Sequence, residues 1–303
     1  MLLMASRSAS GRRRGRGLKV VVAVLALLSL ATVVAVTQSA SPTRSFASAH
    51  KLTVATWNMC GVRQWGCATT GSRSEKKLQL KRLATRAGAR VILLQEACAG
   101  DLESARRELG ASWHSAFRAY KWRNSTGSTS AVPCAVRGQG AAGFAILSAP
   151  ALSHVTAVAS RQPSVGLQRG ILCAQVAAHR IEVCNAHLSP PGSDKAHPGW
   201  EYRDDQLKAL VATVPKRRTV YGGDLNVDPP GVNNPARWVW PAAPYGTHRE
   251  CDQSSGSARS GRPTHLSGHK LDYLFTGLPR SGCAVRDTGT SDHRALLLQV
   301  RTG

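Results

Sequence analysis

Short polar motifs recur where apolar runs end, and this recurrence constrains the fold more than any other feature of the sequence. Four such motifs each follow a run that we expect to be a strand: Asn58, Gln95-Glu96, Asn185-Ala186-His187 and Gly223-Asp224-Leu225-Asn226. In layered α/β architectures, the loops at strand ends bring residues from distant parts of the chain together. The sequence therefore predicts one shared polar site at the ends of several strands.

Apolar runs of strand length alternate with helical patterns over most of the chain. The short runs predict eight strands, at residues 51–58, 90–95, 143–148, 171–177, 181–186, 219–223, 271–275 and 295–301. Apolar spacings of three and four predict three helices, at residues 74–87, 101–109 and 200–214. Six of their apolar residues should lie in the core: Leu78, Leu80, Leu83, Leu207, Leu210 and Val211.

The arrangement of these elements favours a single domain from about residue 50 to residue 303. Many strands with few helices are typical of an α/β or α+β fold, and no Pro/Gly linker divides the middle of the chain. Residues 124–140 and 253–268 are rich in Gly, Ser and basic residues. We expect both stretches to be surface loops, where substrate contacts concentrate.

Residues 1–49 differ from the rest of the chain, because several basic residues between Arg12 and Lys19 precede the uncharged apolar run of residues 20–36. This order is typical of an export signal. The run is long for a cleaved signal and slightly short for a membrane-spanning helix of roughly 20 residues. We expect general export, with cleavage near Ala47-Ser48-Ala49. The protein is then secreted, or it is anchored on the outer face of the cell membrane if residues 20–36 are retained.

Eight cysteines, all after residue 59, also fit an exported protein, since an even count in an exported chain predicts disulfides. Cys173 and Cys184 form the best-supported pair, because a hairpin centred between residues 178 and 179 places them opposite each other. Of the others, Cys60 and Cys67 flank a short loop, and the simplest completion pairs Cys98 with Cys134 and Cys251 with Cys283.

Charge is the next constraint on function. The chain carries a formal charge of +23, and residues 1–49 contain seven basic residues and no acidic one, which leaves +16 for the rest. A domain this basic attracts polyanions such as nucleic acid. A solvated basic surface without a ligand would have the same composition.

Two motifs near the C-terminus add carboxylates and a histidine: Lys270-Leu271-Asp272-Tyr273 and Ser291-Asp292-His293. Together with the strand-end motifs they make a site rich in carboxylates and amides. Such hard oxygen ligands suit Mg²⁺, with Mn²⁺ or Ca²⁺ as alternatives, and neutral histidine can act as an acid, a base or a hydrogen-bond donor. A zinc site is disfavoured because no Cys or His cluster has the required spacing.

The motifs, taken in order, resemble those of the endonuclease/exonuclease/phosphatase superfamily, which includes deoxyribonuclease I, exonuclease III-type repair nucleases, neutral sphingomyelinases and inositol polyphosphate 5-phosphatases. The resemblance covers residues 51–300 and rests on seven motifs: Thr56-Trp57-Asn58, Leu94-Gln95-Glu96, Gly143-Phe144-Ala145-Ile146-Leu147-Ser148, Asn185-Ala186-His187-Leu188, Gly223-Asp224-Leu225-Asn226, Asp272-Tyr273 and Ser291-Asp292-His293. It implies a four-layer α/β/β/α sandwich, in which helices cover two packed, mostly antiparallel β-sheets.

The resemblance also implies which residues bind metal and activate water. It makes Glu96 the principal metal ligand, with Asn58 beside it and Asp292 as a further carboxylate. Asp224 and Asn226 would position or deprotonate the attacking water and hold a phosphate oxygen. An Asx turn is the structural alternative for these two residues.

Three further residues are implied to act on the phosphate. His187 would donate to the phosphoryl oxygens, and His293 would contact the scissile phosphate while Asp272 holds its ring in the required tautomer. Arg169 matches a position where an arginine faces the site, although it could equally be a surface residue. The implied reaction is in-line attack of water on phosphorus, helped by the cation.

The leading functional prediction is therefore an exported, metal-dependent nuclease. A sphingomyelinase-like phospholipid phosphodiesterase, or a phosphatase of the same superfamily, is the alternative. An exposed aromatic hairpin would mark the lipid enzyme, and residues 236–245, with Trp238 and Trp240, are the one candidate segment. A catalytically silent basic binding protein is a distant third. No protein partner is indicated, and we expect a monomer.

Overall fold

The computed structural model describes residues 51–67 and 70–303. The export signal or membrane anchor expected in residues 1–49 lies outside these residues. Within the described part of the chain, no helix combines the length and the apolar character that a membrane span requires.

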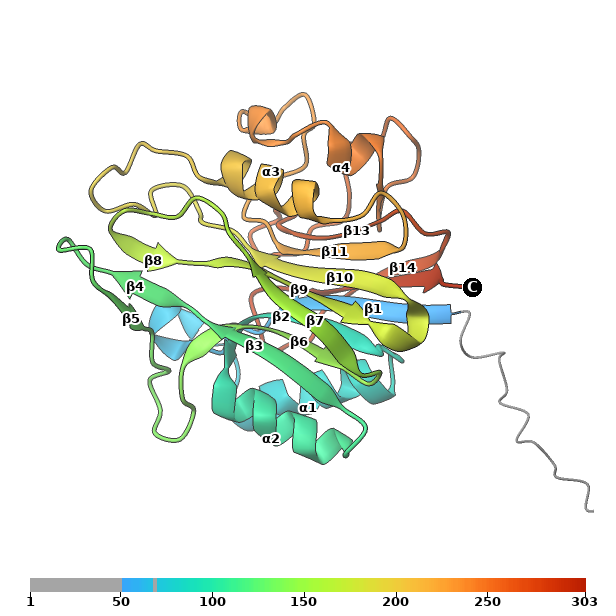
Figure 1. Cartoon of the computed structure of the whole chain (residues 1–303), viewed down its shortest axis with the longest axis horizontal. Coiled ribbons are helices and arrows are strands. Elements are labelled where there is room, and N and C mark those ends of the chain that lie inside the picture. Colours follow the sequence, from blue (N-terminus) through green and yellow to red (C-terminus); the bar gives the residue numbers. More distant parts are fainter. Residues whose placement is uncertain (1–50, 68–69) are drawn as a thin grey trace, which may run out of the picture. The chain divides into compact units, whose positions relative to one another are not determined.

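Two six-stranded sheets form the centre of the structure (Figure 1). The first has the order β14 (Arg280–Arg286), β15 (Ala295–Arg301), β1 (Lys51–Asn58), β2 (Val91–Cys98), β6 (Ala142–Ser148) and β3 (His114–Ala119). The second has the order β12 (Arg249–Glu250), β13 (Asp272–Thr276), β11 (Thr219–Asp224), β10 (Ile181–His187), β9 (Gly170–Val176) and β7 (Leu152–Val158). Each sheet has one parallel pair, β1 with β2 and β10 with β11, and its other pairs are antiparallel.

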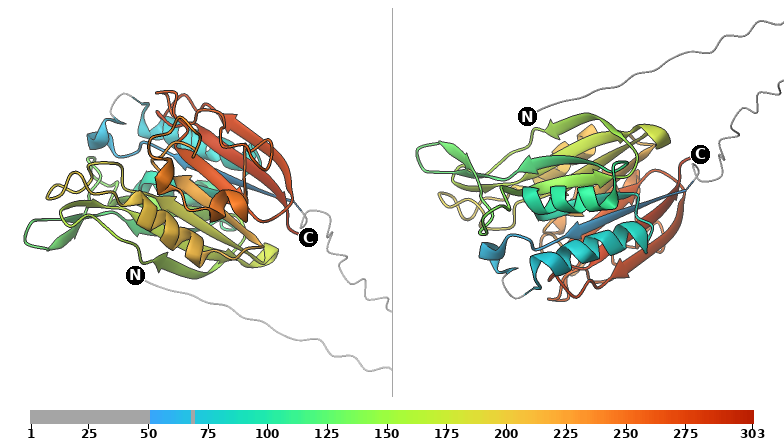
Figure 2. Two further views of the ribbon diagram at one scale, coloured as in Figure 1. Left: turned by 90° about the horizontal axis from the view of Figure 1, so that it is seen from above. Right: turned by 90° about the horizontal axis from the view of Figure 1, so that it is seen from below.

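Helices cover the outer faces of both sheets, as Figures 1 and 2 show. The first sheet is covered by α1 (Arg73–Thr85) and α2 (Ala99–Leu109), and the second by α3 (Arg203–Thr213) and α4 (Ala243–Gly246). Three apolar clusters fill the three interfaces: one between the sheets and one beneath the helices on each side. The predicted four-layer sandwich of two mostly antiparallel sheets is confirmed.

A buried polar network joins the two sheets near the ends of their central strands. The side-chain amide of Asn185 on β10 donates to the carbonyl oxygens of Leu94 and Ala145 in the opposite sheet, each over 2.8 Å. Gln95 Nε2 in turn donates to Asn185 Oδ1 over 2.6 Å. Because each unpaired buried polar group would cost about 1–3 kcal/mol, this network disfavours other alignments of the sheets.

A third, smaller sheet projects from the sandwich, with the order β5 (Thr129–Ala131), β4 (Lys121–Arg123) and β8 (Gly166–Gln168) (Figure 1). All eight predicted strands are present, and so are the three predicted helices, α3 being shorter than expected. Seven strands were not predicted: β3, β4, β5, β7, β8, β12 and β14. Since β5 lies within residues 124–140, the prediction of a continuous loop there is wrong, although those strand residues are exposed.

The prediction that Leu78 belongs to the core is also wrong, because its exposed fraction is 44%. Helix α1 buries Lys76, Leu80 and Leu83, which follow one another at spacings of four and three. Leu78 lies two residues from both Lys76 and Leu80, so it faces away from the core. Lys76 thus occupies a buried position of the helix, which the pattern of apolar residues did not predict. The other predicted core residues are buried, except that Val211 is only partly buried.

Four disulfides close loops within the described chain and leave no free cysteine there. They are Cys60–Cys67, Cys98–Cys134, Cys173–Cys184 and Cys251–Cys283. Cys173 and Cys184 are direct partners in the β9–β10 register, as the hairpin prediction required. Four disulfides indicate an oxidising, extracellular environment.

Candidate active site

The ends of four neighbouring strands in the second sheet lie side by side. His187 is in register with Gly170 of β9 and with Asp224 of β11, and Asp224 is in register with Asp272 of β13. Gly223 permits this close approach, since its φ is 125° and a Cβ there would lie 1.9 Å from the carbonyl oxygen of Ala186. Two of the four strand-end motifs therefore meet in one place, beside Asp272.

Glu96 reaches the site from the first sheet because its backbone is irregular. Side chains alternate along a regular strand, so Glu96 would face away from Gln95, which points between the sheets. The β2–β6 register shifts between Leu94 and Ala97, and Glu96 has a φ of 50°. Bulges and left-handed residues re-aim side chains and cluster at functional sites.

Asn58 links the carboxylates of the two sheets. Its Nδ2 donates to Glu96 Oε1 over 3.3 Å and to Asp224 Oδ2 over 3.0 Å. Its Oδ1 accepts a hydrogen bond of 2.9 Å from the backbone of Cys60. One buried amide thus joins a predicted metal ligand to the residue predicted to position water.

Burial shifts the pKa values of these carboxyl groups. Burial raises the pKa of Glu96 to about 7, although the nearby charges of Arg169 and His293 oppose the shift. Burial, helped by repulsion from Asp272, also raises the pKa of Asp224. A cation bound between these groups would compensate the buried negative charge.

His293 carries a positive charge at neutral pH. Burial lowers its pKa, but the carboxylates of Asp272 and Asp224 outweigh this effect and raise the pKa to about 10. Its Nδ1 lies 2.8 Å from Asp272 Oδ2, while its Nε2 is 3.8 Å from Asp224 Oδ2. Thr264 supports this pair, because its hydroxyl accepts a 2.9 Å hydrogen bond from the backbone of Asp272.

His187 is neutral, and Tyr120 determines which of its ring nitrogens holds the proton. Burial, followed by the charges of Arg169 and His293, lowers the pKa of His187 well below its usual value. Tyr120 Oη accepts a 3.0 Å hydrogen bond from the Glu96 backbone and lies 2.6 Å from His187 Nδ1. Because burial keeps the phenol protonated by raising the Tyr120 pKa, its hydroxyl donates to Nδ1 and leaves the proton of His187 on Nε2.

Replacing Tyr120 by phenylalanine should therefore reduce kcat by about tenfold, because His187 would lose its tautomer preference while the ring packing remains. The measurement is a steady-state comparison with wild type, accompanied by the pH dependence of kcat. We expect KM to change little. Unchanged kcat and an unchanged pH profile would contradict the positioning role of Tyr120.

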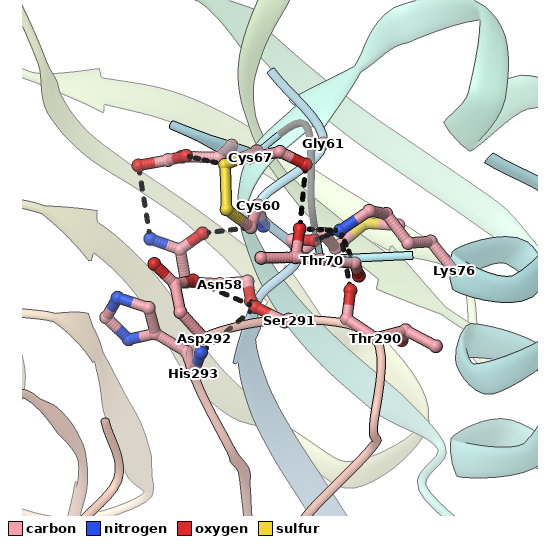
Figure 3. Close-up of a disulfide and its surroundings, with 12 residues drawn as sticks. Asn58, Cys60, Gly61, Cys67, Thr70, Lys76, Thr290, Ser291, Asp292 and His293 are labelled. Carbon is pink, nitrogen blue, oxygen red and sulfur yellow. Dashed lines mark hydrogen bonds between the residues drawn. A yellow bond between two sulfur atoms is a disulfide. The ribbon is translucent and has the colours of Figure 1, made fainter. Parts of the chain in front are cut away.

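A disulfide and a buried lysine hold the loops around the site (Figure 3). Cys67 Sγ lies 3.5 Å from Glu96 Oε2, so the Cys60–Cys67 disulfide packs directly against that carboxylate. Lys76 Nζ donates to the carbonyl oxygens of Met59 over 2.9 Å and of Thr290 over 2.5 Å. This ammonium joins the loop after β1 to the loop that carries Asp292 and His293.

The donor set fits a hard divalent cation. Glu96 and Asn58 contact each other, and Asp272 Oδ1 is buried without a hydrogen-bond partner among the described residues. Asp292 lies in the adjacent loop, where its Oδ2 is 3.5 Å from His265 Nε2. The carboxylates of Asp224 and Asp272 also lie close to each other, but cationic His293 beside them has no lone pair for an ion. Carboxylate oxygens prevail in this set, which suits Mg²⁺, and Asn58 would contribute its Oδ1, which here accepts a hydrogen bond from the Cys60 backbone.

Arg169 and Asn226, two other predicted site residues, differ in how directly their side chains approach the active site. The Arg169 guanidinium acts electrostatically on both Glu96 and His187 and lies over the ring of Trp65. The side-chain amide of Asn226 instead donates to the carbonyl oxygen of Leu188, and its backbone N–H donates to Asp224 Oδ1. The Asx-turn alternative therefore describes part of the role of Asp224, whose carboxylate accepts from the Asn226 backbone.

Sequence reasoning missed Tyr120 and Lys76. Tyr120 lies between β3 and β4, two strands with mostly exposed residues, so no apolar pattern singled it out. Lys76 is one of two consecutive lysines in a helix rich in charged residues. Both residues contact distant segments of the chain, which local spacing does not reveal.

Comparisons with known proteins agree with this architecture. The profile of the Endonuclease/Exonuclease/phosphatase family matches residues 55–293. No curated protein matches the chain significantly. Among solved structures, the human Nocturnin catalytic domain with bound sulfate has 15% identity and a TM-score of 0.59, over 83% of this chain and 95% of that one.

Two nucleases have similar folds. An AP endonuclease from Archaeoglobus fulgidus has 18% identity and a TM-score of 0.53, over 82% of this chain and 98% of that one. A 3'-5' exonuclease from Neisseria meningitidis has 13% identity and a TM-score of 0.55, over 82% of this chain and 99% of that one. At these identities the likeness concerns the fold.

Proposed function

The chain belongs to the Endonuclease/Exonuclease/phosphatase family, whose members hydrolyse phosphoric esters, and on that premise we propose that it is an exported, divalent-metal-dependent nuclease. The observation that carries this proposal is the convergence of Glu96 with Asp224 through Asn58, beside one neutral and one cationic histidine. Such a set provides a cation site, a base and two N–H donors within one small volume.

The metal site is proposed at Glu96 and Asn58, with Asp292 as a further ligand and Mg²⁺ as the ion. Mn²⁺ or Ca²⁺ would suit the same oxygen donors. When bound, the ion supplies charge neutralisation for the phosphate and the leaving oxygen. The buried carboxylate of Glu96 is held ready for it by Asn58 and by the Cys60–Cys67 disulfide.

Asp224 is the proposed base for the attacking water. Burial raises its pKa, which makes it a stronger base than an exposed aspartate. Hydrogen bonds from Asn58 and from the Asn226 backbone fix both of its oxygens. The attack is in line with the leaving oxygen, and no covalent enzyme intermediate is needed.

The two histidines are the proposed donors to the phosphate. The Nε2 atoms of His187 and His293 lie 3.5 Å and 3.8 Å from Asp224 Oδ2, too far for short hydrogen bonds, so both are available to a phosphoryl oxygen. Cationic His293, held by Asp272, contacts the scissile phosphate. His187 stabilises charge as it develops, and Arg169 adds a further positive charge beside both.

Nucleic acid is the proposed substrate because the chain is strongly basic and because residues 236–245 do not form the aromatic hairpin expected of a lipid enzyme. The formal charge after residue 49 favours a polyanion, and a Neisseria 3' phosphatase of the same fold was solved with a product DNA hairpin. The aromatic hairpin that would mark a lipid enzyme is absent from residues 236–245. They form a 3-10 turn (Arg237–Val239) and helix α4, and Trp240 is 8% exposed, which leaves only Trp238 exposed.

The purified protein should cleave plasmid DNA in the presence of Mg²⁺ or Mn²⁺. The cleavage should stop when EDTA is added. A panel with DNA, RNA, sphingomyelin and an inositol phosphate, each with and without chelator, measures this. Cleavage that survives EDTA would remove the metal from the mechanism. Turnover of sphingomyelin without cleavage of DNA or RNA would identify the lipid enzyme instead. No turnover of any substrate would support a silent binding protein.

Export is the remaining part of the proposal. Four disulfides and the basic and apolar segments of residues 1–49 support a protein that acts outside the cell. Mass spectrometry of the mature N-terminus distinguishes a cleaved, secreted form from one anchored on the outer face of the membrane.

A further inference from the structure

A small basic pocket adjoins the candidate active site. Its volume is about 180 Å³, and its polar lining consists of Arg118, Lys121, Ser160, Gln162, Gln168 and Arg169. Three of these side chains are basic, and no acidic residue is among the described residues that line the pocket. The described lining therefore contains three cations and no carboxylate, and a bound anion would reduce the repulsion among the three cations.

Two of the chain segments that line this pocket also contribute to the active site. Tyr120, whose hydroxyl contacts His187, stands between two lining residues, Ala119 and Lys121. On the other side, Gly170 is the register partner of His187. These segments are joined to each other, since Lys121 of β4 pairs with Gln168 of β8. Figure 1 shows β4 beside β8 in the small sheet.

Arg169 connects the pocket to the reacting centre. It lines the pocket, and its charge influences both Glu96 and His187. Its Nε is buried and has no hydrogen-bond partner among the described residues. A buried guanidinium N–H without a partner is costly, and a phosphate oxygen satisfies it well.

We propose that this pocket binds a second phosphate of the substrate, one that flanks the scissile phosphate along the same chain. The inference rests on the proposed nuclease function and specifies it, because a polymer of phosphodiesters has a neighbouring phosphate to place there, whereas sphingomyelin has none. The pocket is smaller than the roughly 300 Å³ of typical small-molecule sites, which suits a single charged group. Arg118 and Lys121 are then the residues that distinguish a nucleic-acid strand from an isolated phosphodiester.

Neutralising Arg118 and Lys121 together, as Arg118→Gln with Lys121→Gln, tests the inference. On an oligonucleotide of the polymer that wild type cleaves, KM should rise about tenfold with kcat nearly unchanged. The slope of log(kcat/KM) against log[salt] should become shallower by about 0.7–0.9 for each lost phosphate contact. The preference for the oligonucleotide over bis(p-nitrophenyl) phosphate, measured as a ratio of kcat/KM values, should fall by about the same tenfold.

The matched control replaces two exposed basic residues at the other end of the first sheet, as Arg86→Gln with Arg301→Gln. It should leave KM and the salt slope as in wild type. A pocket variant with wild-type KM and salt slope overturns the second-phosphate site while the nuclease function stands. Equal losses on the oligonucleotide and on the small diester overturn it too, because Arg118 and Lys121 would then serve the scissile phosphate. A wild type that cleaves no nucleic acid overturns both proposals.

Discussion

Replacing Glu96 by glutamine should lower kcat/KM on the cleaved polymer by at least about 100-fold. The amide has the shape of the carboxylate but lacks its charge. Mutating a residue that only hydrogen-bonds to a metal ligand typically lowers metal affinity or activity by about 10- to 100-fold, so loss of a ligand itself should cost at least as much. Asn58 can still donate to the remaining oxygen, so we expect the fold to be retained. Activity is measured over a Mg²⁺ titration, so that weaker binding is separated from slower turnover.

Thermal unfolding gives a second readout of the same change. A ligand that binds only the native state raises Tm, so Mg²⁺ or Mn²⁺ should stabilise wild type more than Glu96→Gln. Without metal, burial raises the pKa of Glu96 from 4.5 to about 7. The native state then holds the proton more tightly than the unfolded chain, so wild type should lose stability as pH rises from about 4.5 to 7. The glutamine variant should lack this part of the pH dependence.

The matched control is Glu182→Gln, since Glu182 is a partly buried residue at the opposite end of β10 from His187. It should retain wild-type activity and the metal-induced rise in Tm. If Glu96→Gln kept near-normal turnover, or kept the full metal-induced stabilisation, Glu96 would not be the principal ligand.

The central strands could be predicted from the sequence because their burial matches their composition. Strand β1 has the predicted bounds, and β10 and β11 differ from the prediction by one residue at the C-terminal end. Edge strands could not be found in this way. Strand β7, at one edge of the second sheet, has no fully buried residue, and β3 at an edge of the first sheet has one. Half-exposed strands carry no apolar run, so their pairing depends on tertiary contacts.

The residues of the site could be predicted more readily than the contacts among them. The strand-end pattern predicted that His187 and Asp224 lie together, because register aligns the ends of neighbouring strands. Asp272 came from a separate motif and begins the antiparallel strand beside Asp224. The link from Asn58 to Asp224 joins different sheets, and its geometry depends on how those sheets pack. The bulge that turns Glu96 toward Asn58 is likewise a backbone irregularity that alternation does not indicate.

Replacing His187 by alanine should reduce kcat by about 100- to 1,000-fold, which is the usual effect of removing one preorganised donor to a developing oxyanion. His187 is neutral and carries its proton on Nε2, so it donates without first being protonated. Lowering the pH through the usual histidine range should therefore not lower wild-type kcat through this residue. This effect should exceed that of Tyr120→Phe, since Tyr120 orients His187 and the Glu96 backbone and does not itself donate to the phosphate.

His187→Gln separates the donor role from a general-base role, because glutamine offers an N–H but cannot accept a proton. We expect it to recover part of the activity lost in His187→Ala. The matched control is His114→Ala, which removes an exposed histidine at the start of β3 and should leave turnover unchanged. Near-normal kcat in His187→Ala, with the fold verified by its Tm, would show that the phosphate is stabilised by other groups. Glutamine and alanine variants of equal activity would instead indicate that His187 acts by proton transfer.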